Sequence, residues 1–313
     1  MKQTDCTGKM PVKNMLCLLL ATFLWGVAFV AQSIGGEEID AFAYTGIRFL
    51  MGAVVLAPFI AVRRKRRSRI PDEKPGGADA GAGRRAITGG ILCGIFLAAA
   101  ALLQQIGIEH VDVGKAGFLT ALYIILVPCL SFLLTRRSSA KVWIAAAVAL
   151  CGLYCLCMEP GEAFSIGAWE GCLILCALMF AVQILLIDHF SPGVDPLEMS
   201  FVEFLTTGAI GTAAAAVQGN LTLEGISTGA LLALLYSGIL SSGVAYTLQV
   251  VGQRGADPSI ASLIMSLEAP ISAAAGFVIL QQALSAWELL GCVLMSAAIV
   301  LAQLPVPDEL GTG

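Results

Sequence analysis

The residue whose type and position point most clearly to chemistry is Glu268, near the middle of the apolar stretch 261–280. At ~1.5 Å per residue, a helix of this length crosses the hydrocarbon core of a bilayer. A carboxyl group at that depth is costly, so it indicates a functional site. Pro270 removes a backbone N–H two residues later, and we expect it to loosen the helix one turn upstream. These features predict a polar, weakened helix on the pathway of a solute.

Three roles for Glu268 are open from the residues alone. Its carboxylate could bind a cationic group of a solute. It could instead carry a proton and couple transport to a proton gradient, since a buried carboxyl can exchange protons near neutral pH. It could also be a hydrogen-bonded group that locks the packing of helices.

Two further charges lie inside apolar stretches. Arg48 is about a third of the way into 42–62, and Glu203 is about a third of the way into 197–217. We expect each to pair with polar groups inside the bundle. If the two stretches run in opposite directions, the charges differ in depth by ~10 Å at 1.5 Å per residue, so separate partners are a better prediction than a direct salt bridge. We assign structural or gating roles to Arg48 and Glu203, and likewise to the helix-loosening Pro128 and Pro270.

The elements that must position these groups are apolar helices. Of the 313 residues, 58% are hydrophobic and 13% are charged, and the mean hydropathy is +0.85. Soluble domains carry about 25% charged residues, so this composition is that of a membrane protein. The runs long enough to span a bilayer are 14–34, 42–62, 87–107, 114–134, 141–158, 168–187, 197–217, 228–250, 259–280 and 285–304. We therefore predict an all-α membrane protein with ten transmembrane helices.

The positive charges predict its orientation. Nine Lys and Arg residues fall in the connector 63–86, and three more lie between 136 and 141, whereas the alternate connectors carry mainly Asp and Glu. Because basic connectors stay in the cytoplasm, we predict N-in and C-in termini, in a multi-pass protein of the inner (plasma) membrane. The run 63–69 could also be a patch for nucleic acid or lipid headgroups. A topology signal is the simpler interpretation, and no nucleic-acid partner is expected.

The two halves of the chain resemble each other. Arg48-Phe49 matches Glu203-Phe204, and Trp25 matches Phe180, both 155 residues apart. Four more pairs match at an offset of 145: Gln104 and Gln249, Gly107 and Gly252, Asp112 and Asp257, Ala116 and Ala261. We therefore predict two five-helix repeats, 14–158 and 167–304. Because five is odd, the second repeat must enter the membrane from the opposite side. Such inverted repeats are typical of secondary transporters, with the substrate site near the midplane between the copies.

With these features the chain resembles the drug/metabolite transporter (DMT) superfamily, and within it the EamA-type permeases, over nearly its whole length. The motifs that carry the resemblance are Trp25-Gly26, Arg48-Phe49, Thr120-Ala121-Leu122-Tyr123 before Pro128 and, most specifically, Ser266-Leu267-Glu268-Ala269-Pro270. The resemblance implies a small-molecule permease, often an exporter of metabolites or amino acids, that works by alternating access. It implies no particular substrate.

The fold that the resemblance implies has a central cavity lined by six of the helices. The polar and aromatic residues of those helices are our predicted substrate contacts: Trp25, Gln104, Thr120, Tyr123, Gln183, Tyr246, Gln249, Ser266 and Glu268. Aromatic walls with a few placed polar groups suit the recognition of small molecules. The alternative for each residue is ordinary hydrogen bonding between helices, worth ~0.6–2 kcal/mol per contact.

The sequence thus predicts a secondary transporter of a small metabolite such as an amino acid, amine or related solute, with proton coupling through Glu268 as one option. The main alternatives are a membrane channel and a non-transporting membrane protein, and only a carrier saturates and shows counterflow. An intramembrane enzyme is the weaker alternative. His110 and His189 fall at opposite membrane edges, and no H-E-x-x-H, G-x-S-x-G or Walker-A pattern occurs.

The expected partners are a small-molecule substrate and the lipid bilayer. A homodimer is a further option, because the Gly- and Ala-rich stretches 141–158 and 285–304 offer faces that could pack. No cofactor or metal is expected. Nearly all of the ten cysteines fall in apolar runs, where they are interpreted as small hydrophobic residues.

Overall fold

The computed structural model describes residues 10–67, 77–111, 113–135, 139–158, 167–280 and 284–303, and within these ranges it contains helices and connectors but no strand. The predicted all-α class is therefore confirmed. The helices are α1 (Val12–Gly36), α2 (Ala41–Arg67), α3 (Gly77–His110), α4 (Val113–Ala121), α5 (Tyr123–Thr135), α6 (Ala140–Cys157), α7 (Ala168–Phe190), α8 (Pro196–Gln218), α9 (Thr228–Tyr236), the π-helix η1 (Ser237–Tyr246), α10 (Thr247–Gln253), α11 (Pro258–Met265), α12 (Glu268–Leu280) and α13 (Ala286–Gln303).

Within the described ranges, eight helical runs are long and apolar enough to cross a membrane. Two further apolar helices, Ala140–Leu156 and Ala286–Ala302, are shorter. Large apolar side chains such as Leu16, Phe59 and Val293 are more than half exposed. Such a surface suits contact with lipid tails, which are as apolar as leucine.

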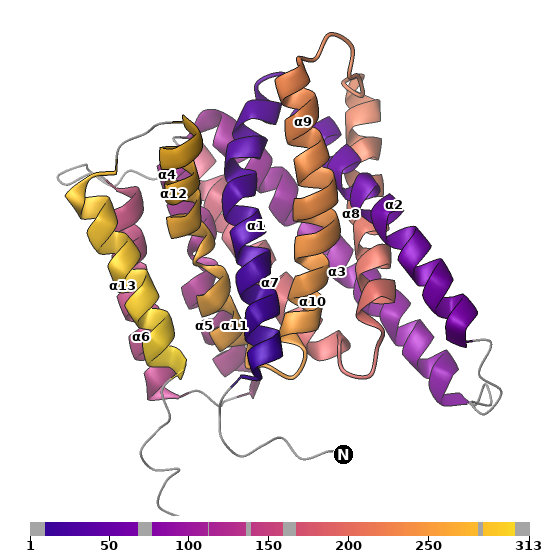
Figure 1. Cartoon of the computed structure of the whole chain (residues 1–313), viewed down its shortest axis with the longest axis horizontal. Coiled ribbons are helices and arrows are strands. Elements are labelled where there is room, and N and C mark those ends of the chain that lie inside the picture. The colour runs from indigo at the N-terminus through magenta and orange to yellow at the C-terminus, as the bar shows by residue number, and fades with distance from the viewer. Residues whose placement is uncertain are drawn as a thin grey trace, which may run out of the picture.

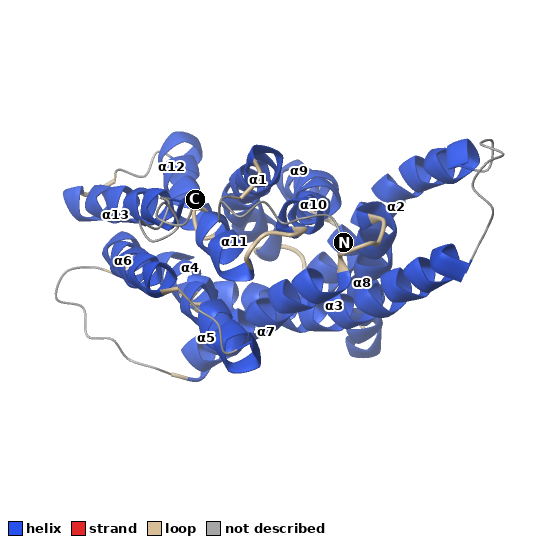
Figure 2. Ribbon diagram, turned by 90° about the horizontal axis from the view of Figure 1, so that it is seen from below, coloured by secondary structure: helices blue, strands red, loops and turns tan. Residues whose placement is uncertain are grey.

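The helices stand in two rows (Figures 1 and 2). One row consists of α13, α12 with α11, α1, α9 with α10, and α2; the other consists of α6, α4 with α5, α7, α3 and α8. Contacts between α6 and α13 join the rows at one end, and contacts between α2 and α8 join them at the other. Each row contains helices from both halves of the chain, so side chains of both halves meet between the rows.

Glycines allow the closest approaches at both ends of the rows. A Cβ placed on Gly211 of α8 would lie 2.7 Å from both Cα and N of Gly46 in α2. At the other end, a Cβ on Gly291 of α13 would lie 2.5 Å from the carbonyl oxygen of Gly152 in α6. The small-residue faces that we considered for a homodimer therefore pack on each other within one chain.

Two of the predicted helices are interrupted. The predicted helix 114–134 divides at Leu122 into α4 and α5, and 259–280 divides at Ser266 and Leu267 into α11 and α12. Pro270 cannot donate to the carbonyl of Ser266, which accepts from the N–H of Ala269 at 3.2 Å instead. The second interruption therefore lies one turn before Pro270, where the sequence predicts a weakened helix.

The structure of the predicted helix 228–250 departs further from the α-helix that the sequence predicts. It extends to Gln253, and its middle is the π-helix η1 rather than an α-helix. Gly238 and Gly243 let α2 approach this wider segment: a Cβ on Gly238 would lie 2.8 Å from that of Met51, and one on Gly243 would lie 3.5 Å from Cα of Gly52. π-Helical segments are rare and frequently occur at functional sites.

The basic connector 63–86 is shorter than expected, because residues 63–67 continue α2 and residues 77–86 begin α3. Its central part, residues 68–76, lies outside the described residues, as does Asp112. Asp257, the counterpart of Asp112, caps α11 by accepting hydrogen bonds from the N–H groups of Ser259 and Ile260 at 2.8 and 3.3 Å.

The connector between α1 and α2 is held against the start of α9. Ser227 caps α9, and its hydroxyl and backbone N–H donate to the two carboxylate oxygens of Glu38, both at 2.6 Å. These two hydrogen bonds hold the pKa of the exposed Glu38 carboxyl below its ordinary value of 4.5, the hydroxyl of Ser227 having the larger effect. Negative charge is also favourable at a helix N-terminus.

The Glu38 contact predicts a pH-dependent contribution to stability. A carboxyl whose pKa is lowered by folding stabilises the protein above its unfolded pKa, and this contribution is lost as the pH falls through the folded pKa. Thermal melting of wild type and Glu38→Gln in detergent should therefore differ at neutral pH and converge in acid. Glu37→Gln, at the preceding exposed position, is the matched control. A difference for Glu38→Gln that stays constant with pH would contradict the prediction.

Candidate functional site

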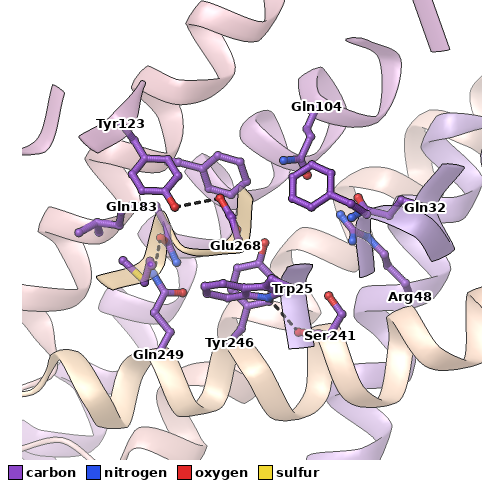
Figure 3. Close-up of a pocket in the computed structure, with 14 residues that line it drawn as sticks. Trp25, Gln32, Arg48, Gln104, Tyr123, Gln183, Ser241, Tyr246, Gln249 and Glu268 are labelled. Atoms are coloured by element: carbon purple, nitrogen blue, oxygen red, sulfur yellow. Dashed lines mark hydrogen bonds between the residues drawn. The ribbon is translucent and has the colours of Figure 1, made fainter. Parts of the chain in front are cut away.

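A cavity between the two rows contains most of the predicted site residues (Figure 3). The side chains around it enclose about 470 Å³ that no atom occupies, including space open to the surface. The lining residues are Trp25, Phe29, Gln32, Arg48, Gln104, Tyr123, Phe180, Gln183, Ile184, Ser241, Tyr246, Gln249, Met265 and Glu268. Seven of the nine predicted substrate contacts are among them.

An aromatic pair from the two halves of the chain forms one wall of the cavity. The rings of Trp25 and Tyr246 lie 4.7 Å apart between centroids, tilted by 59°. Trp25 Nε1 donates to the backbone carbonyl of Ser241 at 3.3 Å. Behind Tyr246, the buried Phe49 packs against its ring at 5.4 Å. The π-helix η1 thus supplies both Tyr246 and the carbonyl that orients Trp25.

Glu268 begins α12, immediately after the interruption of the helix. Its side chain is 9% exposed and lines the cavity. The hydroxyl of Tyr123, on α5, donates to Glu268 Oε1 at 2.9 Å. The interruption therefore places a carboxyl group at the cavity and a tyrosine from the other half of the chain holds it there.

A chain of amide and carboxyl groups continues from the cavity into the bundle. Gln249 Nε2 donates to Gln183 Oε1 at 3.2 Å, and Gln183 Nε2 donates to Glu203 Oε1 at 2.8 Å. Glu203 itself is fully buried and does not line the cavity. The expectation that Glu203 has a polar partner other than Arg48 is therefore correct. Its Oε2 has no partner among the described residues.

Arg48 departs from the expectation that it pairs with polar groups of the bundle. It is 1% exposed and lines the cavity, on the side of Gln32 (Figure 3). Its guanidinium carbon lies 4.9 Å from the ring centre of Phe49 and 6.0 Å from that of Tyr44. Its Nε and Nη2 atoms are buried and have no hydrogen-bond partner in the described part of the chain.

Besides Glu203, four predicted residues do not line the cavity. Thr120 is buried elsewhere, and the hydroxyl of Ser266 donates to the carbonyl of Leu263 at 2.8 Å within the interrupted helix. Pro128 and Pro270 lie inside α5 and α12. Their position agrees with a role in helix shape rather than in contact with a solute.

Six lining residues were not among the predicted site residues: Phe29, Gln32, Phe180, Ile184, Ser241 and Met265. Helical spacing could have found several of them. Phe29 and Gln32 follow Trp25 by four and seven residues, and therefore share its face of α1. Ser241 could not have been found in this way, because its position depends on the π-helix.

Comparisons with known proteins identify a family for this chain. Residues 12–158 and residues 167–304 match the EamA-like transporter family. The chain is 26% identical to an uncharacterized transporter of Archaeoglobus fulgidus over 292 residues. The alignment covers 93% of this chain and 86% of that protein. A shorter segment of 57 residues is 35% identical to the uncharacterized transporter YoaV of Bacillus subtilis, over 18% of this chain and 20% of that protein.

The fold is also known from experiment. A crystal structure matches with a TM-score of 0.74 over 96% of this chain and 99% of the other, at 17% sequence identity. At that identity the match concerns the arrangement of the helices. The two rows of helices are therefore an established fold.

Proposed function

We propose that this chain, which belongs to the EamA-like transporter family of the drug/metabolite transporter superfamily, is a secondary carrier of a small organic solute. The family and the helices make it a multi-pass membrane transporter. The observation that carries the proposal is the cavity between the rows. Charged, amide and aromatic side chains from both halves of the chain surround it, as alternating access around one central site requires.

The arrangement of the rows supports two inverted repeats, over 14–158 and 167–304. If each predicted helix is exchanged for its counterpart in the other half, the row α1, α2, α9–α10, α11–α12 and α13 becomes the row α7, α8, α3, α4–α5 and α6. Contacts are exchanged in the same way: α1 against α12 corresponds to α7 against α5. With this pairing of repeats, we propose that ten helices cross the membrane, and that the shorter helices α6 and α13 are two of them.

For the orientation we propose N-in and C-in termini in the plasma membrane, with the basic connector 63–86 in the cytoplasm. The loop between α8 and α9 then faces outward. Alkaline phosphatase fused after Gly225 tests this, because an inactive fusion would place that loop in the cytoplasm. The bilayer is the second partner that we propose. A homodimer would have to use faces other than those of Gly152 and Gly291, which are occupied within the chain.

Transport is tested by counterflow. Proteoliposomes containing the full chain are loaded with an excess of one unlabelled amino acid or amine, and the same labelled solute is added outside. We expect a transient accumulation of label and a rate that saturates with concentration, because a carrier must bind each solute before it moves. Protein-free liposomes are the control. A rate that rises linearly with concentration and shows no counterflow would identify a channel and overturn the proposal.

A further inference from the structure

A groove lies between helices α2, α3 and α8, at the end where α2 and α3 lead into the basic connector 63–86. It encloses about 980 Å³ that no atom occupies, including space open to the surface. The lining residues are Ala57, Ile60, Ala61, Gly83, Ala86, Ile87, Glu198, Phe201 and Val202. None of these residues lines the central cavity, so the groove is separate from the proposed solute site.

The groove begins where α3 moves away from α8. Nearer the middle of the bundle the two helices are in close contact, since a Cβ on Gly90 would lie 2.7 Å from that of Val202. Two turns earlier in α3, a Cβ on Gly83 would meet no heavy atom of the described residues within 4 Å. Pro58 lies inside α2 and cannot donate a backbone hydrogen bond, which favours a bend of that helix before this end. Figures 1 and 2 show these ends of α2 and α3 extending away from the other helices.

The groove opens onto the apolar outer surface of the helices. Of its lining residues, Ala57, Ala61 and Ile87 are exposed. Large apolar side chains continue this surface along α2, where Val54 and Phe59 are more than half exposed. In a chain that spans a membrane, such a surface lies against lipid tails. An acyl chain can therefore enter the groove from the bilayer.

Basic side chains lie at the connector end of the groove on both helices. Lys65 follows the lining residue Ala61 by one turn of α2, and is therefore on the same side of that helix. Arg84 precedes the lining residue Ile87 by about one turn of α3, and shares its side in the same way. Both basic side chains are exposed. Because α2 runs toward the connector and α3 runs away from it, both charges lie beyond the same end of the groove.

Two carboxyl groups at this end belong to the start of α8. Asp195 caps the helix by accepting from the N–H of Leu197 at 3.1 Å, and it pairs with Arg63 at 3.3 Å. Glu198 lines the groove within the first turn of α8, where the helix dipole favours a negative charge. The connector 63–86 carries nine Lys and Arg against three Asp and Glu. These carboxylates therefore leave an excess of positive charge at the end of the groove.

We propose that the groove binds an anionic phospholipid, with an acyl chain among the apolar lining residues and the phosphodiester headgroup at Lys65 and Arg84. An anionic lipid matches both the apolar groove that is open to the bilayer and the basic end beyond it. A second copy of the chain would bring the same positive charge to this end, and is therefore a poorer match. The inference goes beyond the proposed carrier function and does not depend on the solute. It gives these basic residues a role besides the orientation of the chain.

The first experiment identifies the lipids that stay bound. The full chain in neutral detergent is incubated at low salt with equal amounts of dioleoyl phosphatidylglycerol and dioleoyl phosphatidylcholine, and bound lipids are identified by native mass spectrometry. The two lipids have the same acyl chains and differ in net charge. We expect phosphatidylglycerol to be preferred about 25-fold, since each of two basic side chains near a membrane surface contributes about 5-fold. Equal retention of both lipids, or retention of neither, would overturn the proposal.

The second experiment fills the groove with a side chain. Gly83→Leu places a side chain in the open space, and leucine is the better helix former, so the helix should persist. We expect retention of phosphatidylglycerol to fall about 10-fold or more. Gly81→Leu is the matched control, because Gly81 lies on the opposite side of α3, does not line the groove and has equally open surroundings among the described residues.

The control variant Gly81→Leu should retain the lipid as wild type does. Equal retention by Gly81→Leu and Gly83→Leu would overturn the proposal. The melting temperatures of both variants without added lipid should match that of wild type, so a loss of lipid in Gly83→Leu could not be attributed to unfolding. A dimer that is lost in Gly83→Leu while lipid retention is unchanged would assign the groove to a second copy instead.

The third experiment removes the charges at the end of the groove. The double variant Lys65→Gln with Arg84→Gln should lower the preference for phosphatidylglycerol about 25-fold and leave retention of phosphatidylcholine unchanged. The control is Lys13→Gln with Lys141→Gln, which removes two charges from the starts of α1 and α6. This control should keep the preference. An equal loss in both double variants would indicate general attraction to the basic side of the protein and would contradict the site.

Discussion

Glu268→Gln is expected to lower uptake of the counterflow substrate by about 10- to 150-fold, the effect of losing a charge-assisted hydrogen bond, and to abolish its dependence on a pH gradient. The amide oxygen of glutamine can still accept from the hydroxyl of Tyr123, now at 2.9 Å from Glu268, so the packing of α12 should persist. What the variant loses is the negative charge and the ability to bind and release a proton. Uptake is measured in proteoliposomes with and without an imposed pH gradient.

Two variants make this result specific. Tyr123→Phe removes the hydroxyl but leaves the ring and the Glu268 carboxyl in place, so we expect a smaller loss of uptake and a retained pH response. Glu203→Gln removes another buried carboxyl, one that does not line the cavity, and should also retain the pH response. A pH response that survives in Glu268→Gln would exclude proton coupling through this residue. A response lost only in Glu203→Gln would assign it to that carboxyl instead.

Gly211→Val is expected to give a large loss of stability. A Cβ at this position would lie 2.7 Å from backbone atoms of Gly46, and neither backbone can give way unless α2 moves off α8. Overpacking costs about 1–3 kcal/mol, and more where backbone must shift. Since α2 also carries Arg48, two residues after Gly46, the cavity should lose its solute together with the helix contact. The melting temperature and the monodisperse yield of the purified protein measure the effect.

A second helical glycine is the control for Gly211. Gly171 lies near the start of α7, is exposed, and would have no heavy atom within 4 Å of an added Cβ. Gly171→Ala should therefore keep or raise the stability, by up to about 1 kcal/mol, because alanine is the better helix former. Equal melting of Gly211→Val and wild type would show that the α2–α8 contact is looser than the structure describes.

Much of the architecture follows from the sequence because it depends on local patterns. Apolar runs of about 20 residues predict spanning helices through length alone, and the structure contains helices over all ten predicted stretches. Pro270 predicts the weak point before it because a missing N–H acts within one turn. Asp257 before Pro258 predicts the start of α11, because an aspartate cap and a proline in the first helical position are both local signals. Seven residues of the cavity were also predicted, as polar and aromatic residues of the six helices that line the cavity in the fold implied by the family resemblance.

The chemistry of the site depends on contacts between distant segments, which no local pattern contains. Glu268 meets Tyr123 across 145 residues, and Arg48 packs beside Phe49 and Tyr44, with no acceptor for its Nε and Nη2 among the residues that the structure describes. The π-helix, which aims Tyr246 and Ser241 at the cavity, arises where α2 packs on Gly238 and Gly243. Helical periodicity determines which residues share one face of a helix. The helix that packs against this face is determined by the crossing of helices and by close glycine contacts such as that of Gly46 with Gly211. The sequence alone therefore determined the helices and their polar residues, whereas only the tertiary structure decided that Glu203 accepts from Gln183 inside the bundle and that Arg48 lines the cavity beside Phe49 and Tyr44.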